Sequence, residues 1–160
     1  MDKLWAPWRY QYVSASKKKQ GCIFCQAYSQ KNSAEVIFKS EHSVAMLNIF
    51  PYNNGHLLIA PKAHAADLTE LNDAQLLDLM RSLDKAKQLL QKALKPDGFN
   101  IGINLKRAAG AGITDHLHLH IVPRWVGDTN FMPVFSKTKI ISQSLKELAK
   151  LLKKCLKQKK

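Results

Sequence analysis

The sequence predicts an α+β fold: an antiparallel sheet with one long helix packed on it and a C-terminal basic helix. Three observations lead to this fold class. Short aliphatic and β-branched runs lie between turn residues, one long stretch repeats apolar residues at helical spacing, and a late segment alternates histidine with aliphatic residues. A length of 160 residues with 46% hydrophobic content suits a single domain over 1–160.

The predicted strands lie on both sides of the long helix. Turn residues such as Asn53-Asn54-Gly55 separate them from their neighbours. The predicted strands span residues 36–39, 44–47, 56–59 and 99–105. A loop at 108–113 then leads to the histidine segment, and so short a connection indicates an antiparallel pair.

Asn72 opens the clearest helix. Gln75 lies three residues later and completes a capping-box pattern, and Pro96-Asp97-Gly98 is expected to end the helix. The helical repeat of apolar residues predicts which side is buried. The residues expected on that side are Leu76, Met80, Leu83, Leu90 and Leu94.

The C-terminal segment 137–160 holds most of the positive charge. It contributes +8 of the net charge of +13, and residues from about 142 to 156 are predicted to form an amphipathic basic helix. The apolar positions of this helix are Leu145, Leu148, Leu152 and Leu156. We interpret the lysines as a solvated face and a frayed tail. Because no aromatic residue follows Phe135, the segment offers bases no stacking platform, and nucleic acid is an unlikely partner.

Residues 1–21 are predicted to form an irregular arm that is aromatic and basic. Pro7 and the lysine run at 17–19 argue against one continuous helix there. The first residues lack the apolar region of a signal peptide, no run approaches a membrane span of about eighteen apolar residues, and three cysteines are too few for a disulfide framework. We therefore expect a cytoplasmic protein without a membrane partner.

The segment 116–122 is the most informative part of the chain, because it alternates three histidines with three aliphatic residues. In a strand, side chains two positions apart share a face, so the imidazoles would lie together and the aliphatic residues would enter the core. The histidines are His116, His118 and His120, and the aliphatic residues are Leu117, Leu119 and Ile121. Groups that titrate near neutrality on one face suit phosphate chemistry or metal binding.

Three interpretations of this segment compete. It can be a surface strand with incidental histidines, a metal site completed by neighbouring strands, or a nucleophilic site in which a neutral imidazole attacks phosphorus. The loop Ala109-Gly110-Ala111-Gly112 directly precedes the histidines, and its small residues can present backbone N–H groups to a phosphate. This position favours the nucleophilic interpretation.

Cys22 and Cys25 have the spacing of a redox or metal pair. A redox pair usually follows a strand in a βαβ unit, and this part of the chain, predicted as a compact knuckle, has none. A zinc site needs two further ligands, and histidines must supply them because the chain has no second such pair. Unmetallated thiols are the alternative, and Cys155 stands alone in the lysine-rich segment.

Three motifs resemble the histidine-triad (HIT) family. They are residues 55–59 (GHLLI) with Pro61, the glycine loop at 110–112, and the segment 116–122 (HLHLHIV). Residues 4–9 (LWAPWR), 51–57 (PYNNGHL) and 123–131 (PRWVGDTNF) further resemble the bacterial diadenosine-tetraphosphate phosphorylase/hydrolase branch. With these motifs the resemblance covers nearly the whole chain.

The resemblance implies a HIT-like fold, a homodimer and a two-step reaction on a nucleotide α-phosphate. His118 would attack phosphorus and form a nucleotidyl-histidine, which water or phosphate would then resolve. By the same family pattern, His120 contacts the transferred phosphate and His56 supports the triad. Asn48 occupies the ribose-binding position and Asn104 the position near the phosphates.

The resemblance also implies a structural zinc site and no organic cofactor. His64 and His116 match the positions that complete a Cys₂His₂ set with Cys22 and Cys25 in zinc-bearing relatives. His116 would then serve the metal and not the substrate. Zinc would stiffen the strand that carries the nucleophile.

The loop before the triad departs from the family pattern. Several branches carry Gln or Ser four or three residues before the first histidine, where this chain has Gly112 and Ile113. The nearest hydroxyl is that of Thr114, so Thr114, water or another group can protonate the leaving group. Backbone donors from Gly110 to Gly112 would stabilise charge on the phosphate oxygens.

Two further functions remain compatible with the sequence. Within the family, the alternative is a purine nucleoside phosphoramidase, which cleaves a P–N bond. From another class, the alternative is a non-catalytic, zinc-stabilised basic module that binds nucleic acid. The regular triad argues against the module, because binding alone does not require such placement.

Overall fold

The computed structural model describes residues 21–30, 34–129 and 141–158. The predicted arm, except for Gly21, lies outside these ranges, as do residues 137–140 and 159–160 of the predicted C-terminal segment and residues 130–131 of the motif at 123–131. Among the described residues, no helix has both the length and the apolar character that crossing a bilayer requires.

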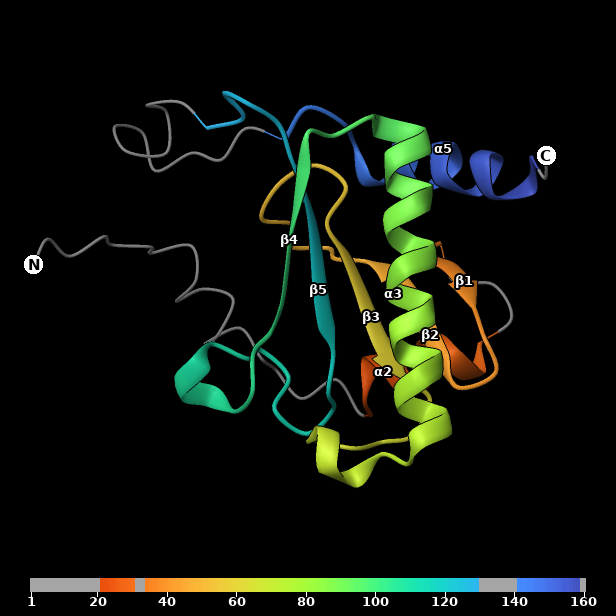
Figure 1. The fold of residues 1–160 in the computed structure, drawn as a ribbon, viewed down its shortest axis with the longest axis vertical. Coiled ribbons are helices and arrows are strands. Elements are labelled where there is room, and N and C mark those ends of the chain that lie inside the picture. The colour runs from red at the N-terminus through yellow and green to blue at the C-terminus, as the bar shows by residue number, and fades with distance from the viewer. Residues whose placement is uncertain (1–20, 31–33, 130–140, 159–160) are drawn as a thin grey trace, which may run out of the picture.

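The core of the fold is a five-stranded sheet in which every neighbouring pair is antiparallel (Figure 1). The strand order is β1-β2-β3-β5-β4. The strands are β1 (Val36–Lys39), β2 (Ser43–Leu47), β3 (Leu57–Pro61), β4 (Gly98–Ile103) and β5 (Leu119–Arg124). The predicted α+β class with an antiparallel sheet is therefore confirmed.

Helices cover both faces of the sheet. The long helix α3 (Asp73–Leu94) and the C-terminal helix α5 (Leu145–Lys157) pack on one face, and the short helix α2 (Ile23–Ser29) packs on the other. Strand alternation divides the core accordingly. Leu57 and Ile59 of β3 join the α3 side, while Leu58 and Ala60 join Phe24 on the α2 side.

The predicted capping box of α3 is confirmed. The Asn72 side chain accepts from the Gln75 N–H, and the Gln75 side chain accepts from the Asn72 N–H, both at 3.0 Å. The burial prediction is wrong for Met80, which is 55% exposed. The buried stripe is centred on Leu79, Leu83 and Leu90, and Met80 lies about 100° around the helix from Leu79, on its flank.

Two other boundaries differ from the sequence prediction. The predicted knuckle around the cysteine pair is a seven-residue helix, α2, whose N-cap is Cys22. The C-terminal helix begins at Leu145 and not near 142, because the Ser144 side chain caps it by accepting from the Glu147 N–H. Its predicted apolar side is confirmed, with Leu148 and Leu152 fully buried.

The predicted strand at the histidine segment starts later than expected. β5 begins at Leu119, and His116 and His118 precede it. The reason is that the Leu117 N–H bonds the Ala65 carbonyl at 2.6 Å, outside the β3 ladder. The predicted alternation persists, since Leu117, Leu119 and Ile121 are all buried in the α3-side core.

Gly55 is a point where the fold leaves no room for a side chain. Its φ is +81°, and a Cβ there would lie 2.7 Å from Leu94 Cδ1 and 2.8 Å from Pro123 Cγ. Gly127 has a similar φ of +76° but nothing within 4 Å of its Cβ position. The two glycines therefore separate the cost of backbone strain from the cost of crowding.

We expect Gly127→Ala to lower the free energy of unfolding by about 1 kcal/mol, because only the left-handed backbone penalises it. Gly55→Ala should cost about 2–4 kcal/mol, because overpacking against Leu94 and Pro123 is added. Urea unfolding monitored by circular dichroism measures both values. Equal losses for the two variants would contradict the packing assigned to Gly55.

Candidate functional site

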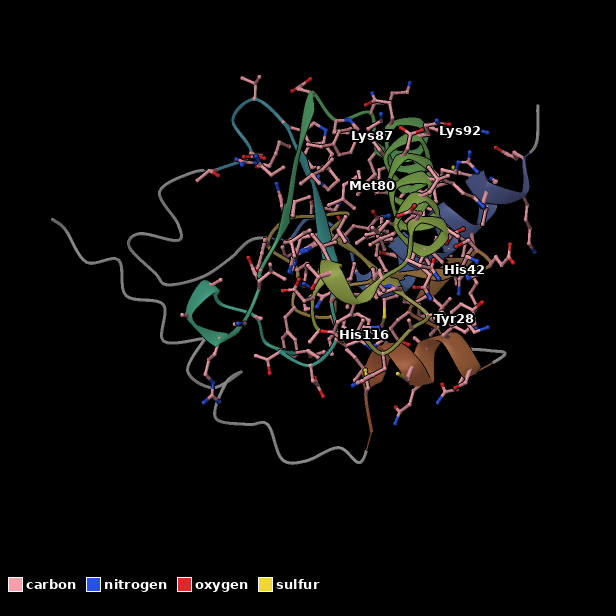
Figure 2. The ribbon with its side chains drawn as sticks, turned by 60° about the horizontal axis from the view of Figure 1, so that its bottom comes forward. Tyr28, His42, Met80, Lys87, Lys92 and His116 are labelled. Carbon is pink, nitrogen blue, oxygen red and sulfur yellow. The ribbon has the colours of Figure 1, made fainter. Side chains whose placement is uncertain are left out.

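The three triad histidines lie on the sheet face opposite α3, next to α2. His116 and His118 are 1% and 5% exposed, and both rings pack against Phe24, with centroids 5.1 and 4.9 Å away. Figure 2 shows His116 close to α2, the helix that Cys22 caps and that contains Cys25. The histidine rings and α2 thus share one small core.

His116 points its two ring nitrogens to different partners. Nε2 lies 2.8 Å from the Pro61 carbonyl oxygen, which can only accept, so Nε2 carries the proton. In the neutral ring Nδ1 then has a free lone pair. This lone pair faces Cys22, Cys25 and His64.

The structure brings together the four residues predicted as metal ligands. Nδ1 of His116 lies 3.1 Å from Cys22 Sγ and 3.2 Å from His64 Nδ1, while Cys25 Sγ lies 3.3 Å from His64 Nδ1 and 3.7 Å from His116 Nδ1. All four ligand atoms lie within 4.8 Å of one another. Tetrahedral zinc with N and S ligands has edges of roughly 3.3–3.8 Å, so these residues fit such an ion closely.

His118 has one fixed tautomer in this geometry. Its Nδ1 lies 2.9 Å from the His116 carbonyl oxygen, so Nδ1 donates and Nε2 holds the lone pair. Burial lowers the pKa of His118 below the ordinary 6.5, against the opposing effect of this hydrogen bond. The ring is therefore neutral and carries an unprotonated Nε2 near pH 7.

His56 and His120 form a hydrogen-bonded pair whose direction can be assigned. The Tyr52 N–H donates to His56 Nδ1 at 3.0 Å, so the neutral His56 ring carries its proton on Nε2. This Nε2 lies 2.9 Å from His120 Nδ1 and donates to it. His120 must then hold its own proton on Nε2, a buried atom without a hydrogen-bond partner among the described residues.

The chain brings His56 to His120 through the β3–β5 ladder. Leu58 pairs with His120 in that ladder, and His56 lies just before β3, which begins at Leu57 and not at His56 as predicted. Burial and the neighbouring His118 lower the pKa of His120 to about 4. His120 is therefore uncharged at neutral pH.

Tyr52 contacts both members of this pair, and sequence reasoning did not single it out. Its ring centroid lies 4.6 Å from that of His56 and 5.6 Å from that of His120, and it is nearly parallel to His120, at 10°. An aromatic residue in the 51–57 motif was the available signal. Its position three residues before Gly55, in a turn, gave no indication of stacking.

The predicted nucleotide-binding residues are distributed unevenly. The Asn48 side chain lies against His56, with Nδ2 3.3 Å from His56 Nδ1, and its Oδ1 accepts from the Phe50 N–H at 2.9 Å. Asn104 follows β4, and Thr114 lies in the bend before His116. In the described part of the chain, neither Asn104 nor Thr114 hydrogen-bonds a histidine.

The glycine loop uses two of its three predicted donors internally. The Gly110 N–H bonds the Arg107 carbonyl at 2.9 Å, and the Ala111 N–H bonds the Lys106 carbonyl at 3.3 Å, around the short 3₁₀ helix η2 (Arg107–Ala109). Gly112 is exposed, and its N–H has no acceptor among the residues that the structure describes. Of the three, Gly112 is the amide available to a ligand.

The fold and the site together define a histidine-triad protein: an antiparallel sheet that carries alternating histidines beside a small-residue loop. A comparison with protein-family models agrees, because the HIT domain model matches residues 29–126. The chain belongs to the HIT family.

Relatives of known name share most of the chain. An AP-4-A phosphorylase of Mycobacterium tuberculosis is 32% identical over 161 residues, which covers 95% of this chain and 83% of the relative. The adenosine 5'-monophosphoramidase hnt1 of Schizosaccharomyces pombe is 34% identical over 103 residues, covering 64% of this chain and 74% of hnt1. The crystal structure of a Zn-bound histidine triad family protein from Mycobacterium smegmatis has a TM-score of 0.69 at 30% identity, covering 86% and 94% of the two chains.

The neutral His120 makes stability depend on pH. Its pKa is about 4 in the folded protein against an ordinary 6.5, so between these values the unfolded chain binds more protons than the folded one. The contribution of the neutral His120 ring to the free energy of unfolding is therefore fully present above pH 6.5 and is lost as the pH falls toward 4. We expect wild type to lose on the order of 1–2 kcal/mol more than His120→Gln between pH 7 and pH 4.5.

Urea unfolding at the two pH values measures this difference. His42→Gln is the matched control, because His42 contacts Glu41 at the surface and leaves the buried pair intact. It should retain the wild-type pH dependence. If wild type and His120→Gln lost the same free energy of unfolding, the assignment of the pH dependence to His120 would be refuted.

Proposed function

We propose that this protein is a HIT-type nucleotide hydrolase or phosphorylase that cleaves dinucleoside polyphosphates, of the diadenosine tetraphosphate kind, at an α-phosphate. The observation that carries the proposal is the tautomer of His118. Its Nδ1–H is held by the His116 carbonyl, so a neutral Nε2 lone pair is left for attack on phosphorus. The AP-4-A phosphorylase relative supports this substrate class.

In the first step, Nε2 of His118 forms a bond to the α-phosphorus while the P–O bond to the leaving nucleotide breaks. The product is a covalent nucleotidyl-His118. In the second step, water or phosphate attacks the same phosphorus and the P–N bond breaks, which releases a nucleoside monophosphate or diphosphate. Dividing one displacement into two gives each step a good nucleophile or a good leaving group.

Other residues supply charge stabilisation in this scheme. The Nε2–H of His120 donates to an oxygen of the transferred phosphate, and His56 keeps that proton on Nε2 by donating to His120 Nδ1. The free Gly112 N–H is a second donor. In this scheme Asn48 contacts the ribose and Asn104 the phosphates, and Thr114, water or another group protonates the leaving group.

The test is to trap the covalent intermediate. We expect mass spectrometry of rapidly quenched reactions to show a nucleotidyl adduct on His118 in wild type and none in His118→Ala. Turnover of the variant should fall on the order of 10⁴-fold. An adduct that persists in His118→Ala would rule out His118 as the nucleophile.

A comparison of substrates distinguishes this proposal from the phosphoramidase alternative, which the hnt1 relative favours. Diadenosine tetraphosphate and an adenosine phosphoramidate are compared, each with and without phosphate. Cleavage of the phosphoramidate alone would replace the first proposal with the second. A protein that turns over neither substrate, and binds nucleic acid with salt-dependent affinity, would instead fit the non-catalytic module.

We further propose that Cys22, Cys25, His64 and His116 hold a structural zinc ion. The donor set supports this, because two thiols and two imidazole Nδ1 atoms converge and the His116 lone pair is directed at them by Pro61. Bound zinc would supply a rigid tetrahedral crosslink between α2 and His116, two residues before the nucleophile. We also propose a cytoplasmic location, because three cysteines are too few for a disulfide framework.

We expect metal analysis to find about one zinc per chain in wild type and in Cys155→Ser. Cys25→Ser should lose the metal and be less stable by roughly 3 kcal/mol, because zinc binds only the folded ligand set. Cys155 is the matched control, since it is a half-buried thiol on α5 far along the chain from the site. Full zinc content in Cys25→Ser would contradict the ligand assignment.

We also propose that the protein is a homodimer joined at the β4 edge. In the described part of the chain β4 pairs only with β5, so one edge of β4 is open. Ile101 on β4 is 49% exposed, and on α3 Leu77 and Met80 are 52% and 55% exposed. Figure 2 shows Met80 on the flank of α3 toward β4, and the exposed apolar side chains on these two elements would become buried in such a dimer.

We expect Ile101→Lys to convert the dimer to a monomer, because it places a charge in the centre of the apolar interface. Sedimentation velocity measures the change. Val126→Lys is the control, since Val126 is 93% exposed and lies beyond β5. An Ile101→Lys protein that sediments like wild type would refute this interface.

A further inference from the structure

The sheet places His56 beside His120, and the turn before His56 helps to orient its ring. His56 precedes β3, and two donors face its Nδ1: the Tyr52 N–H at 3.0 Å and the Asn48 side-chain amide at the longer distance of 3.3 Å. The Tyr52 ring then covers both His56 and His120. Whatever holds Tyr52 in place therefore also determines the direction of the His56–His120 hydrogen bond.

Asn53 connects this turn to the end of β5. Its Nδ2 donates to Asp128 Oδ2 at 2.8 Å and lies 3.4 Å from the Pro123 carbonyl. Within the turn, its Oδ1 accepts from the Asn54 N–H at 2.9 Å, and its carbonyl accepts from the His56 N–H at 3.3 Å. Asn53 is thus the residue through which the turn is anchored.

Asp128 is itself rigidly held. Arg124 binds both of its carboxylate oxygens, through Nε at 2.6 Å and Nη2 at 2.8 Å, and the Trp125 N–H donates to Oδ2 at 3.1 Å. Arg124 also reaches β4, with Nη1 2.6 Å from Asn100 Oδ1. The side chain of Asp128 is only 8% exposed, and Arg124 holds its pKa far below the usual range.

These contacts form a continuous connection from two strands to the buried histidine pair. We propose that Asp128 is a positioning residue: through Asn53 it holds Tyr52 where the Tyr52 N–H and ring keep His56 donating to His120. Asp128 is too far along the connection to touch the histidines itself, and it acts by fixing the turn. Its effect on turnover rests on the proposed function, whereas its effect on the histidine tautomers does not.

Loss of the Asn53–Asp128 hydrogen bond would change which ring nitrogens of His56 and His120 carry protons. If the turn moves the Tyr52 N–H away, only the longer contact from Asn48 Nδ2, at 3.3 Å, still faces His56 Nδ1. A neutral His56 ring can then carry its proton on Nδ1 more readily, and its Nε2 then accepts from His120 Nδ1. His120 would lose the proton on Nε2 that the proposed reaction directs at the phosphate. The three residues Asn53, Arg124 and Asp128 thus determine which nitrogen of His120 is a donor.

The experiment compares Asp128→Asn with Asp97→Asn. Asp97 is the matched control, because it accepts one hydrogen bond from the same loop, from the Val126 N–H at 2.8 Å, and has no contact with Asn53. Long-range ¹H–¹⁵N NMR reads the protonated nitrogen of His56 and His120 without any substrate. Steady-state kinetics with diadenosine tetraphosphate gives kcat and KM separately.

We expect Asp128→Asn to shift the His56 and His120 tautomers and to lower kcat about tenfold, with KM changed less than about twofold. Asp97→Asn should match wild type in both readouts. Asn53→Ala removes the same contact from the other side, so it should reproduce the effect, and the double variant should lose little more than either single variant.

Unchanged tautomers in folded Asp128→Asn or Asn53→Ala would overturn the proposal, as would fully additive losses in the double variant. If Asp128→Asn does not fold, Asn53→Ala carries the test alone. A tautomer shift in a protein whose wild type cleaves no nucleotide would support the positioning role and refute the proposed function. Failure of the positioning role and failure of the proposed function therefore give different results.

Discussion

The antiparallel pairing of β3 with β5 is the constraint on which the rest of the site depends. The register that sets Leu58 opposite His120 also brings His56, just before β3, within 2.9 Å of the His120 ring. A shift of one residue would turn the histidines into the α3-side core. The buried aliphatic residues Leu119 and Ile121 prevent this shift, so the hydrophobic core determines the geometry of the polar face.

Backbone groups then assign the protons on this face. The Pro61 carbonyl directs the lone pair of His116 toward the cysteines, and the His116 carbonyl directs the lone pair of His118 away from the backbone. The Tyr52 N–H instead donates to His56 Nδ1, so the proton of a neutral His56 ring lies on Nε2. Because these partners are main-chain atoms, their positions follow from the fold. The His116 lone pair faces Cys22, Cys25 and His64, whereas His118 and His120 have the nitrogens that the proposed reaction requires.

Much of this arrangement could be predicted because its signals are local or periodic. The alternation that buries Leu117, Leu119 and Ile121 is a two-residue pattern, and the capping box of α3 is a four-residue one. The grouping of Cys22, Cys25, His64 and His116 followed from the family resemblance, and the structure places all four together. The start of β5 was misplaced because periodicity does not reveal where a ladder ends.

The positioning contacts could not be predicted, because nothing local distinguishes them. Asn53 and Asp128 are 75 residues apart, and each lies in a polar turn where a solvated side chain is the ordinary expectation. Only the tertiary structure shows that Asp128 is 8% exposed and receives hydrogen bonds from Asn53, Arg124, Trp125 and Thr129. A carboxylate that is 8% exposed needs such donors to offset its desolvation, and one of them, Asn53 Nδ2, connects the end of β5 to the turn that carries Tyr52.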